Sequence, residues 1–302
     1  MTQPWIPEHP FTLDKVRLWV NRHIPDLADA HISLLGQGWD NVVYLLNEDT
    51  VLRTPQRDLA LPGFIRECEA LEHIQTCLRT PKPKLYDLSY DIHPYPVSVS
   101  GFLPGIDSVQ LGKDVLCENS AKAMGQFLAT LHQIRPKQNL PIDPSQRGDL
   151  HFRAQKLLSL TSDPLITPFL GISHITIPKR LALCHGDLHF LHVLLDSNGM
   201  PQSVIDWGDM CLANPLIDLS ILFLLWDSNG QMALIQTYRE LGGELIFEEL
   251  LAAFILALFL NRALHLYSED QQKIPLQLYT KRQWDRMLQN TSLESLRELA
   301  RN

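Results

Sequence analysis

The sequence predicts an α+β protein of two lobes, in which a small lobe built on an antiparallel sheet precedes a larger, mainly helical lobe. Three β-rich runs lie in residues 32–53, separated by glycines and by the turn-prone Asn47-Glu48-Asp49 segment. From about Glu118 onward, apolar residues recur mostly at helical spacing. A chain of 302 residues is long enough for two domains, and we place the boundary between residues 102 and 103.

The first lobe is expected to begin with an amphipathic helix that has Thr12 as its N-cap. An antiparallel meander follows, and one or two further strands are expected in residues 94–105, with the hinge at residues 99–103. Between them we expect a helix that ends before Pro81 and Pro83. Its apolar face comprises Phe64, Cys68, Leu71, Ile74 and Leu78.

The second lobe is expected to hold helices at residues 118–134 and 151–160, then short apolar pieces around residues 182–207. Three helical segments, at residues 216–226, 231–243 and 248–267, are expected to complete the chain. The longest apolar run, residues 250–260, is about half the length needed to cross a bilayer, so we expect a buried helix.

Composition excludes several classes of function. The net charge of −8, without a cluster of Lys and Arg, argues against nucleic-acid binding. Five cysteines without a C-x-x-C pair indicate a reducing compartment and no cysteine zinc site. The first ten residues do not have the pattern of a signal peptide. We therefore expect a cytoplasmic protein that has no membrane partner.

The stretch LCHGDLHFLHVLLD, residues 183–196, places Asp187 on a short polar loop between apolar segments. Nineteen residues later, Asp206 follows a predicted strand and precedes Trp207-Gly208. A carboxylate near an acceptor hydroxyl and a second carboxylate that binds a metal are what phosphoryl transfer requires. Each motif alone is equally typical of a structural hydrogen bond or a turn cap. Their order and spacing, downstream of a glycine-containing meander, favour the functional interpretation.

These motifs resemble the aminoglycoside phosphotransferase family, which has a protein-kinase-like fold of two lobes. The resemblance extends from LLGQGWDNVVYLLNEDTVLRTP to IDWGDMCLANPLIDLS. It implies that residues 1–102 form a nucleotide-binding lobe and that residues 103–302 carry the catalytic loop and the acceptor site. By the same resemblance, Asp187 is the catalytic base, His185 and Asp218 support the loop, and His192 and Asp206 hold Mg²⁺. The residues expected to bind the nucleotide, ATP or GTP, are Gly36, Gly38, Asn41, Arg53, Glu67, Val99 and Gly101.

Two positions depart from the usual family pattern. Arg53 stands where the family has a lysine, and its helix partner is expected to be Glu67, with Glu69 as the competing choice. His192 replaces the common asparagine. A histidine at this position resembles the macrolide 2'-phosphotransferases and the aminoglycoside 2''-phosphotransferases. Because imidazole is a poor magnesium ligand, three roles stay open for His192: weak metal binding, use of manganese, or binding of the metal's water.

The acceptor is expected to be the hydroxyl of a small molecule. Gly186 replaces the arginine that in protein kinases contacts a phosphorylated loop, and only twelve residues separate Asp206 from Asp218, so no protein substrate is expected. Macrolide and aminoglycoside antibiotics are candidate acceptors, and a metabolic kinase or a non-catalytic nucleotide-binding protein are the alternatives. Two residue groups were weighed for the acceptor site and do not decide between these: Glu240, Glu244, Glu248, Glu249, Glu269 and Asp270; and Trp226, Phe247, Phe254, Phe259, Tyr267 and Tyr279.

Overall fold

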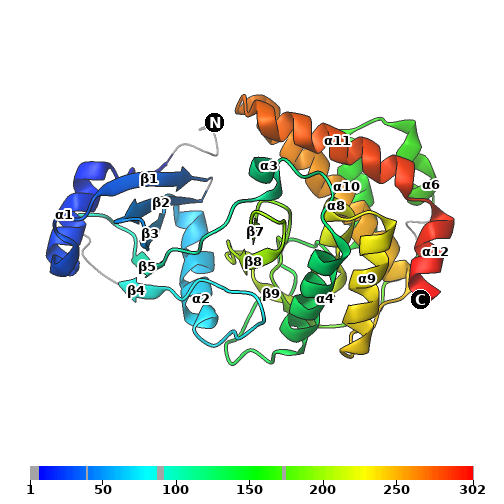
Figure 1. The fold of residues 1–302 in the computed structure, drawn as a ribbon, viewed down its shortest axis with the longest axis horizontal. Helices are drawn as coiled ribbons and strands as arrows, with labels where there is room; N and C mark the ends of the chain where they lie inside the picture. Colours follow the sequence, from blue (N-terminus) through cyan, green and yellow to red (C-terminus); the bar gives the residue numbers. More distant parts are fainter. Residues whose placement is uncertain (1–6, 39, 87–91, 172–174, 302) are drawn as a thin grey trace. The chain divides into compact units, whose positions relative to one another are not determined.

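The structure is a computed structural model that describes residues 7–38, 40–86, 92–171 and 175–301. The chain divides into two compact units. The N-terminal unit comprises Met1–Ile74 and Thr80–Leu103, and the C-terminal unit comprises Gln75–Arg79 and Pro104–Asn302. The first unit is built on an antiparallel sheet and the second is mainly helical, so the predicted α+β, protein-kinase-like fold class is confirmed (Figure 1).

The N-terminal unit contains a five-stranded antiparallel sheet in the order β1-β2-β3-β5-β4. Its strands are β1 (Ile32–Gln37), β2 (Asn41–Leu46), β3 (Thr50–Pro55), β4 (Lys84–Tyr86) and β5 (Val97–Gly101). The first three strands form the expected meander. The sequence analysis did not place β4, because three residues are too few to show an alternating pattern.

Helix α1 (Leu13–His23) and helix α2 (Leu61–Leu71) contact opposite faces of this sheet. Val16, Trp19 and Val20 of α1 share one buried core with sheet residues that include Leu52. Arg53 points to the other face, because neighbouring residues of a strand alternate, and it contacts α2. The sheet therefore presents the side chain of Arg53 on the α2 face.

Helix α2 is shorter than predicted, and Ile74 and Leu78 lie beyond its end. The ammonium group of Lys82 donates to the carbonyl oxygens of Leu71 (2.6 Å) and Ile74 (2.5 Å), which stabilises the helix terminus. The next residues belong to the C-terminal unit, where the backbone of Arg79 bonds to Gln202 and Val204 beside a strand. The apolar spacing that suggested a longer helix therefore arises partly from another packing partner.

The C-terminal unit is mainly helical and contains two small antiparallel pairs of strands. The strands are β6 (Ala182–Cys184), β7 (Val193–Leu195), β8 (Pro201–Val204) and β9 (Cys211–Ala213), and β6 pairs with β9 and β7 with β8. The helices are α3 (Ser108–Leu111), α4 (Glu118–Gln133), α5 (Leu150–Leu160), α6 (Thr167–Leu170), α7 (Leu216–Leu219), α8 (Ile221–Leu225), α9 (Ser228–Glu240), α10 (Phe247–Asp270), α11 (Ile274–Asn290) and α12 (Leu293–Arg301). Among the described residues, three short 3₁₀ turns lie at Pro25–Leu27 and Asp58–Ala60 of the N-terminal unit and at Pro164–Ile166 of the C-terminal unit.

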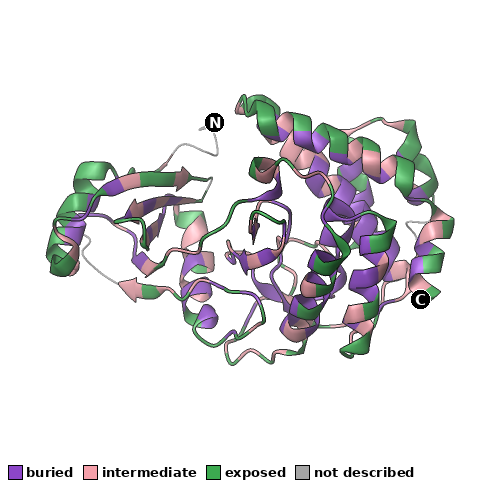
Figure 2. Ribbon diagram, viewed as in Figure 1, coloured by how far each residue is buried: buried purple, intermediate pink, exposed green. Residues whose placement is uncertain are grey.

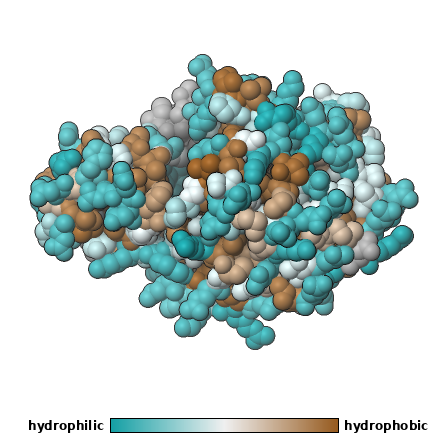
Figure 3. Space-filling view, viewed as in Figure 1, coloured by the Kyte–Doolittle hydropathy of each residue, from teal (hydrophilic) through white to brown (hydrophobic). Residues whose placement is uncertain are grey.

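Helix α10 is the one helix in the described part of the chain that is long and apolar enough to cross a membrane. Most of its residues from Glu249 to Leu260 are buried, and it packs against α5, α7, α8, α11 and α12 (Figure 2). Hydrophobic groups form only separate small areas on the face of this unit in view (Figure 3). The expected buried helix is therefore observed, and its composition is that of a core helix.

The prediction that three helical segments complete the chain was wrong, because α11 and α12 follow α10. In α11 only five residues are buried, Leu276, Tyr279, Thr280, Gln283 and Met287, and two of them are polar. In α12 the buried residues are Leu296 and Leu299. Such sparse apolar positions carry a weak periodic signal, although they suffice to attach each helix to α10.

Close packing of α4 against α9 gives a test of the fold. A Cβ atom at Gly125 would lie 2.7 Å from the carbonyl oxygen of Leu234. We expect Gly125→Ala to lower the free energy of unfolding by about 1–3 kcal/mol, whereas glycine-to-alanine in an unhindered helix would raise it. Chemical denaturation measures this change, with Gln126→Ala on the exposed side of α4 as the control. A more stable Gly125→Ala variant would contradict this packing.

Candidate active site

The segment that follows β6 carries the HGDL motif, and residues 185–192 form an irregular loop that leads into β7. A second loop, residues 205–210, connects β8 to β9. Because β6 pairs with β9 and β7 pairs with β8, the four short strands hold both loops at one place. The two aspartates selected from the sequence, Asp187 and Asp206, belong to these two loops.

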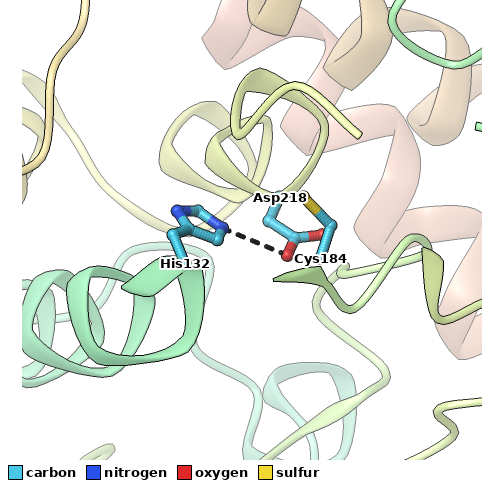
Figure 4. Close-up of side chains that lie close together, drawn as sticks. All are labelled: His132, Cys184 and Asp218. Atoms are coloured by element: carbon cyan, nitrogen blue, oxygen red, sulfur yellow. Dashed lines mark hydrogen bonds and ion pairs between the residues drawn. The ribbon is translucent and has the colours of Figure 1, made fainter. Parts of the chain in front are cut away.

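A buried carboxylate holds the backbone of the first loop from behind. Asp218 of α7 accepts hydrogen bonds from the amides of His185 (2.7 Å) and Gly186 (3.0 Å). His132 of α4 approaches the same carboxylate at 3.4 Å, and Cys184 of β6 lies beside it (Figure 4). Because Asp218 is fully buried, these bonds replace the water it lost on folding, and they determine where the loop begins.

Gly186 is required by the shape of the loop. Its φ is +89°, and a Cβ atom there would lie 2.1 Å from the carbonyl oxygen of Asp209. No residue with a side chain fits without moving the second loop. The glycine found in place of the protein-kinase arginine therefore has a steric reason within this unit.

His185 links the two loops as a neutral ring. Its Nε2 lies 3.0 Å from the carbonyl oxygen of Ile205, and its Nδ1 lies 3.3 Å from the amide nitrogen of Asp187. The hydrogen bonds assign the proton to Nε2, because the carbonyl can only accept and the amide can only donate. Burial lowers the pKa of His185, which agrees with a neutral ring.

Arg147 is the site residue that the sequence analysis missed. Its guanidinium contacts Asp187 Oδ1 at 3.0 Å and Asp209 Oδ2 at 3.4 Å, and it donates to the carbonyl oxygen of Gly186. The carboxylate of Asp143 accepts from the amide of Arg147 at 2.8 Å and so fixes the backbone of this residue. One cation therefore connects both loops and fixes the orientation of the candidate base.

The charge state of Asp187 follows from this arrangement. Burial alone would raise its pKa, but Arg147 first, and then His189, His192 and His185, lower it to about 2. Burial and His192 lower the pKa of His189 to about 3, so His189 is neutral near pH 7. Arg147 is therefore the permanent charge that keeps Asp187 ionised, although the Asp187 side chain is only 23% exposed.

His192 and Asp206 face each other, with His192 Nε2 3.4 Å from Asp206 Oδ2. The other ring nitrogen of His192, Nδ1, lies 2.8 Å from the carbonyl oxygen of Asp187 and donates to it, so Nε2 is the ring nitrogen that faces Asp206. Asp206 lies two residues beyond β8 and has a φ of +63°, a conformation that residues other than glycine rarely adopt. Such backbone strain is found mostly at functional sites.

In the N-terminal unit, the guanidinium of Arg53 contacts Glu67 Oε1 at 2.6 Å. Between the two expected partners, the structure therefore selects Glu67, and Glu69 is exposed. The side chain of Glu67 is only 3% exposed and that of Arg53 is 16% exposed, so the pair is largely shielded from water. An arginine held in this way has a fixed direction at the sheet surface.

The other predicted nucleotide residues lie along the same sheet. Gly36 lies near the end of β1, where it pairs with Val43, and Gly38 lies between β1 and Asn41, the first residue of β2. Trp39 of the same motif lies outside the described residues. Neither glycine has a positive φ, and a Cβ atom would meet nothing described within 4 Å of Gly36 and only the Asn41 oxygen near Gly38, at 3.8 Å. The fold described here therefore does not itself require glycine at these positions.

Val99 and Gly101 lie on β5 toward the opposite end of the sheet. Gly101 pairs with Thr50 at the start of β3, whereas Asn41 pairs with Pro55 at its end. Five residues of strand, about 17 Å, separate these two ends. The predicted nucleotide residues are thus distributed over the length of one sheet and do not form one compact cluster.

The residues weighed for the acceptor site are mostly engaged elsewhere. Arg180 contacts Glu244 at 2.6 Å and the buried Glu249 at 3.2 Å, so these acids are already paired. Among the aromatic residues, Trp226, Phe254 and Tyr279 are fully buried in the core. Neither group therefore supports an acceptor of particular charge or polarity.

Comparison with known proteins supports the expected resemblance. A family described as "Phosphotransferase enzyme family" matches residues 31–253. The uncharacterized protein YcbJ of Bacillus subtilis (strain 168) is 24% identical, and the match covers 69% of this chain and 74% of that protein.

Solved structures share the fold at low sequence identity. A GDP and kanamycin complex of APH(2")-IIia superimposes with a TM-score of 0.68 at 15% identity, covering 91% of this chain and 99% of the other. Macrolide 2'-phosphotransferase MphH from Brachybacterium faecium gives 0.62 at 18%, covering 90% and 97%. A choline/ethanolamine kinase family protein from Mesorhizobium loti gives 0.56 at 18%, covering 94% and 99%. Likeness at these identities shows the fold alone.

The pKa of Asp187 gives a pH prediction. Because its folded value of about 2 lies below the ordinary 3.8, the stabilisation from its ionised form is present above pH 3.8 and is lost as pH falls toward 2. Asp187 therefore causes no loss of nucleotide consumption between about pH 8 and pH 5 in the wild type. Arg147→Met should raise this pKa by about 1–3 units and shift the acid limb of the pH–rate profile upward by the same amount.

Arg282→Met is the matched control, because it removes an Arg–Asp pair with Asp114 on the exposed side of α11. Its pH profile should coincide with that of the wild type. An unchanged acid limb in Arg147→Met would show that Arg147 does not govern the ionisation of Asp187.

Proposed function

Because the chain belongs to the phosphotransferase enzyme family, we propose that it transfers the γ-phosphoryl group of ATP or GTP to a hydroxyl group of a small molecule. The observation that carries this proposal is the carboxylate of Asp187, held ionised and oriented by Arg147 on a loop of fixed backbone. An ionised carboxylate can accept a hydroxyl proton without first losing one of its own.

In the proposed reaction, the acceptor oxygen attacks the γ-phosphorus while its proton passes to Asp187. The bond from that phosphorus to the bridging oxygen of the β-phosphate breaks, and the nucleoside diphosphate leaves. Arg147 occupies Oδ1 of the carboxylate, so Oδ2 is the oxygen that meets the hydroxyl. A carboxylate with a pKa of about 2 is a weak base. This suits phosphoryl transfer, whose loose transition state requires little negative charge on the attacking oxygen, so that positioning matters more than base strength.

Asp206 and His192 are the residues proposed to hold the divalent cation. Their facing ligand atoms and the strained backbone of Asp206 fit a metal site, and the nitrogen donor suits Mn²⁺ better than the predicted Mg²⁺. A cation bound there would neutralise charge on the transferred phosphate. The hydrogen bond that His192 Nδ1 donates to the carbonyl oxygen of Asp187 orients the ring so that Nε2 would face the cation.

The N-terminal unit is proposed to bind the nucleotide. Arg53, fixed by Glu67, offers a forked donor for phosphate oxygens. The lack of a side chain at Gly36 and Gly38 would let a phosphate approach the backbone there without hindrance. Val99 and Gly101, at the other end of the sheet, are proposed to contact the base.

A surface pocket of about 490 Å³ is the proposed acceptor site. It is lined by Gly148, Asp149, Leu150, His151, Ile175, Thr176 and Ile177, and it starts at the residue that follows Arg147. A pocket of this volume suits a small molecule. The paired acidic residues and buried aromatic residues of the C-terminal helices do not distinguish between an antibiotic, an amino alcohol and a sugar as the acceptor.

We propose that the reaction takes place in the cytoplasm, which agrees with five cysteines that are all free.

The test of this function is a panel of hydroxyl acceptors, incubated with ATP or GTP and with Mg²⁺ or Mn²⁺. The panel includes macrolides, aminoglycosides, amino alcohols and sugars, and mass spectrometry detects a product that carries one added phosphoryl group. The proposal predicts a product with the wild type, formed about 10²–10⁴-fold more slowly by Asp187→Asn. Nucleotide binding without any product across the panel would favour a non-catalytic nucleotide-binding protein.

The acceptor pocket gives a second prediction. Thr176→Trp places a large side chain at an exposed position of the pocket wall, so the protein should fold normally. We expect the KM for the acceptor to rise at least about 10-fold while the KM for the nucleotide is unchanged. Leu165→Trp, at an exposed site outside the pocket, is the control. Equal acceptor KM values for both variants would place the acceptor elsewhere.

A further inference from the structure

Four side chains of the two loops present metal-binding atoms toward one another. His189 Nε2 lies 3.7 Å from Asp187 Oδ2, and His192 Nε2 lies 3.4 Å from Asp206 Oδ2. The ligand atoms of Asp187, His189 and His192 all lie within 4.8 Å of one another. The rings of the two histidines are tilted by 32° to each other, with their centroids 3.8 Å apart.

This donor set differs from the one that magnesium prefers. Two imidazoles and two carboxylates favour a borderline first-row transition ion, such as Zn²⁺ or Co²⁺. Four ligands at about 2.0–2.2 Å in a tetrahedron lie about 3.4 Å from one another. The two measured separations, 3.4 and 3.7 Å, are close to that value. Asp206 lies outside the group formed by the other three ligands, so its side chain must move to reach the same ion.

The surroundings of the ligands also suit a metal. Arg147 binds the other oxygen of Asp187, and the carbonyl of Asp187 fixes the ring of His192, so both ligands are oriented from behind. His189 accepts a long bond of 3.3 Å from the Leu191 amide, and it must give up this bond to bind a metal through Nε2. Asp206 is 49% exposed and provides access from solvent.

A second group of potential metal ligands consists of His132, Cys184 and Asp218 (Figure 4). Its ligand atoms are already used in other interactions. Both oxygens of Asp218 accept backbone amides, and Nδ1 of His132 bonds to the hydroxyl of Tyr238 at 2.9 Å. Burial raises the pKa of the Cys184 thiol well above its ordinary value, so this group does not supply a thiolate.

We propose that the catalytic loop binds one transition ion of the Zn²⁺ type through Asp187, His189, His192 and Asp206. The ion takes Oδ2 of Asp187, the oxygen assigned above to the acceptor hydroxyl, so the same ion blocks phosphoryl transfer. The binding site stands on the geometry alone, whereas the block rests on the proposed function.

The test uses Co²⁺ as the probe, added to the full chain in the absence of nucleotide and acceptor. A tetrahedral site of nitrogen and oxygen ligands gives visible ligand-field absorption, and Zn²⁺ displaces it whereas Mg²⁺ at the same concentration does not. We expect one Co²⁺ per chain and affinity at least about 10-fold weaker in His189→Gln. His265→Gln, which removes a histidine from a similar His–carboxylate pair with Glu269, should bind Co²⁺ like the wild type.

A second variant guards against misfolding of the buried His189 position. Asp206→Asn changes a half-exposed ligand, and it should also weaken Co²⁺ binding while its melting temperature in the absence of metal matches that of the wild type. Equal affinity in His189→Gln and wild type, no binding by the wild type, or a thiolate-to-cobalt charge-transfer band would overturn the site. Because no turnover is involved, a failed acceptor panel would leave this result intact.

Once an acceptor is known, Zn²⁺ should inhibit the wild type at concentrations that fill the Co²⁺ site, even with Mg²⁺ in excess. Co²⁺ binding without inhibition would keep the site and overturn the block. The two parts of the proposal are therefore tested separately.

Discussion

The geometry of the candidate active site depends on one buried carboxylate. Asp218 has no exposed surface, and its carboxylate oxygens accept hydrogen bonds from the amides of His185 and Gly186. Removing an ion from water costs several kcal/mol, which is recovered only where charged hydrogen bonds replace the lost water. The loop that satisfies Asp218 therefore has little freedom. Its shape requires the left-handed glycine, brings the Gly186 carbonyl to Arg147, and leaves Asp187 beside that cation.

The same unit separates charged from neutral groups. Asp187 is kept ionised by Arg147, whereas burial keeps His185 and His189 neutral. The ionised carboxylate of Asp187 is suited to accept a proton, and Nε2 of His192 together with Asp206 is suited to bind a cation. These protonation states result from burial and from one arginine. Without Arg147, burial would raise the pKa of Asp187 and favour its protonated form.

Sequence patterns predicted the features that have a local cause. Alternation identified the β-meander, helical spacing identified α4, α5, α9 and α10, and the HGDL and IDWG motifs identified two loops that lie together. Arg147 was not predicted, because it lies forty residues before Asp187 in a connection without periodicity, and only the folded chain brings the two together. Its one local signal is the set of charged residues Asp143, Arg147 and Asp149 between the helices expected at residues 118–134 and 151–160.

Other differences have the same origin. The end of α2 was misplaced because Arg79 pairs with the β8 region, a contact distant in sequence. The strand β9 has three residues and is defined by partners distant in sequence, β6 and the bridge from Leu212 to Ile142. The choice between Glu67 and Glu69 depends on which side of α2 faces β3, and the helical spacing allowed either until the register was known.

The central claim is that Asp187 accepts the proton of the acceptor hydroxyl. The most direct measurement is the single-turnover rate of phosphoryl transfer with bound nucleotide, compared between wild type and Asp187→Asn. The account predicts a rate about 10²–10⁴-fold lower in the variant, with nucleotide affinity close to that of the wild type. An equal rate in the two proteins would contradict it.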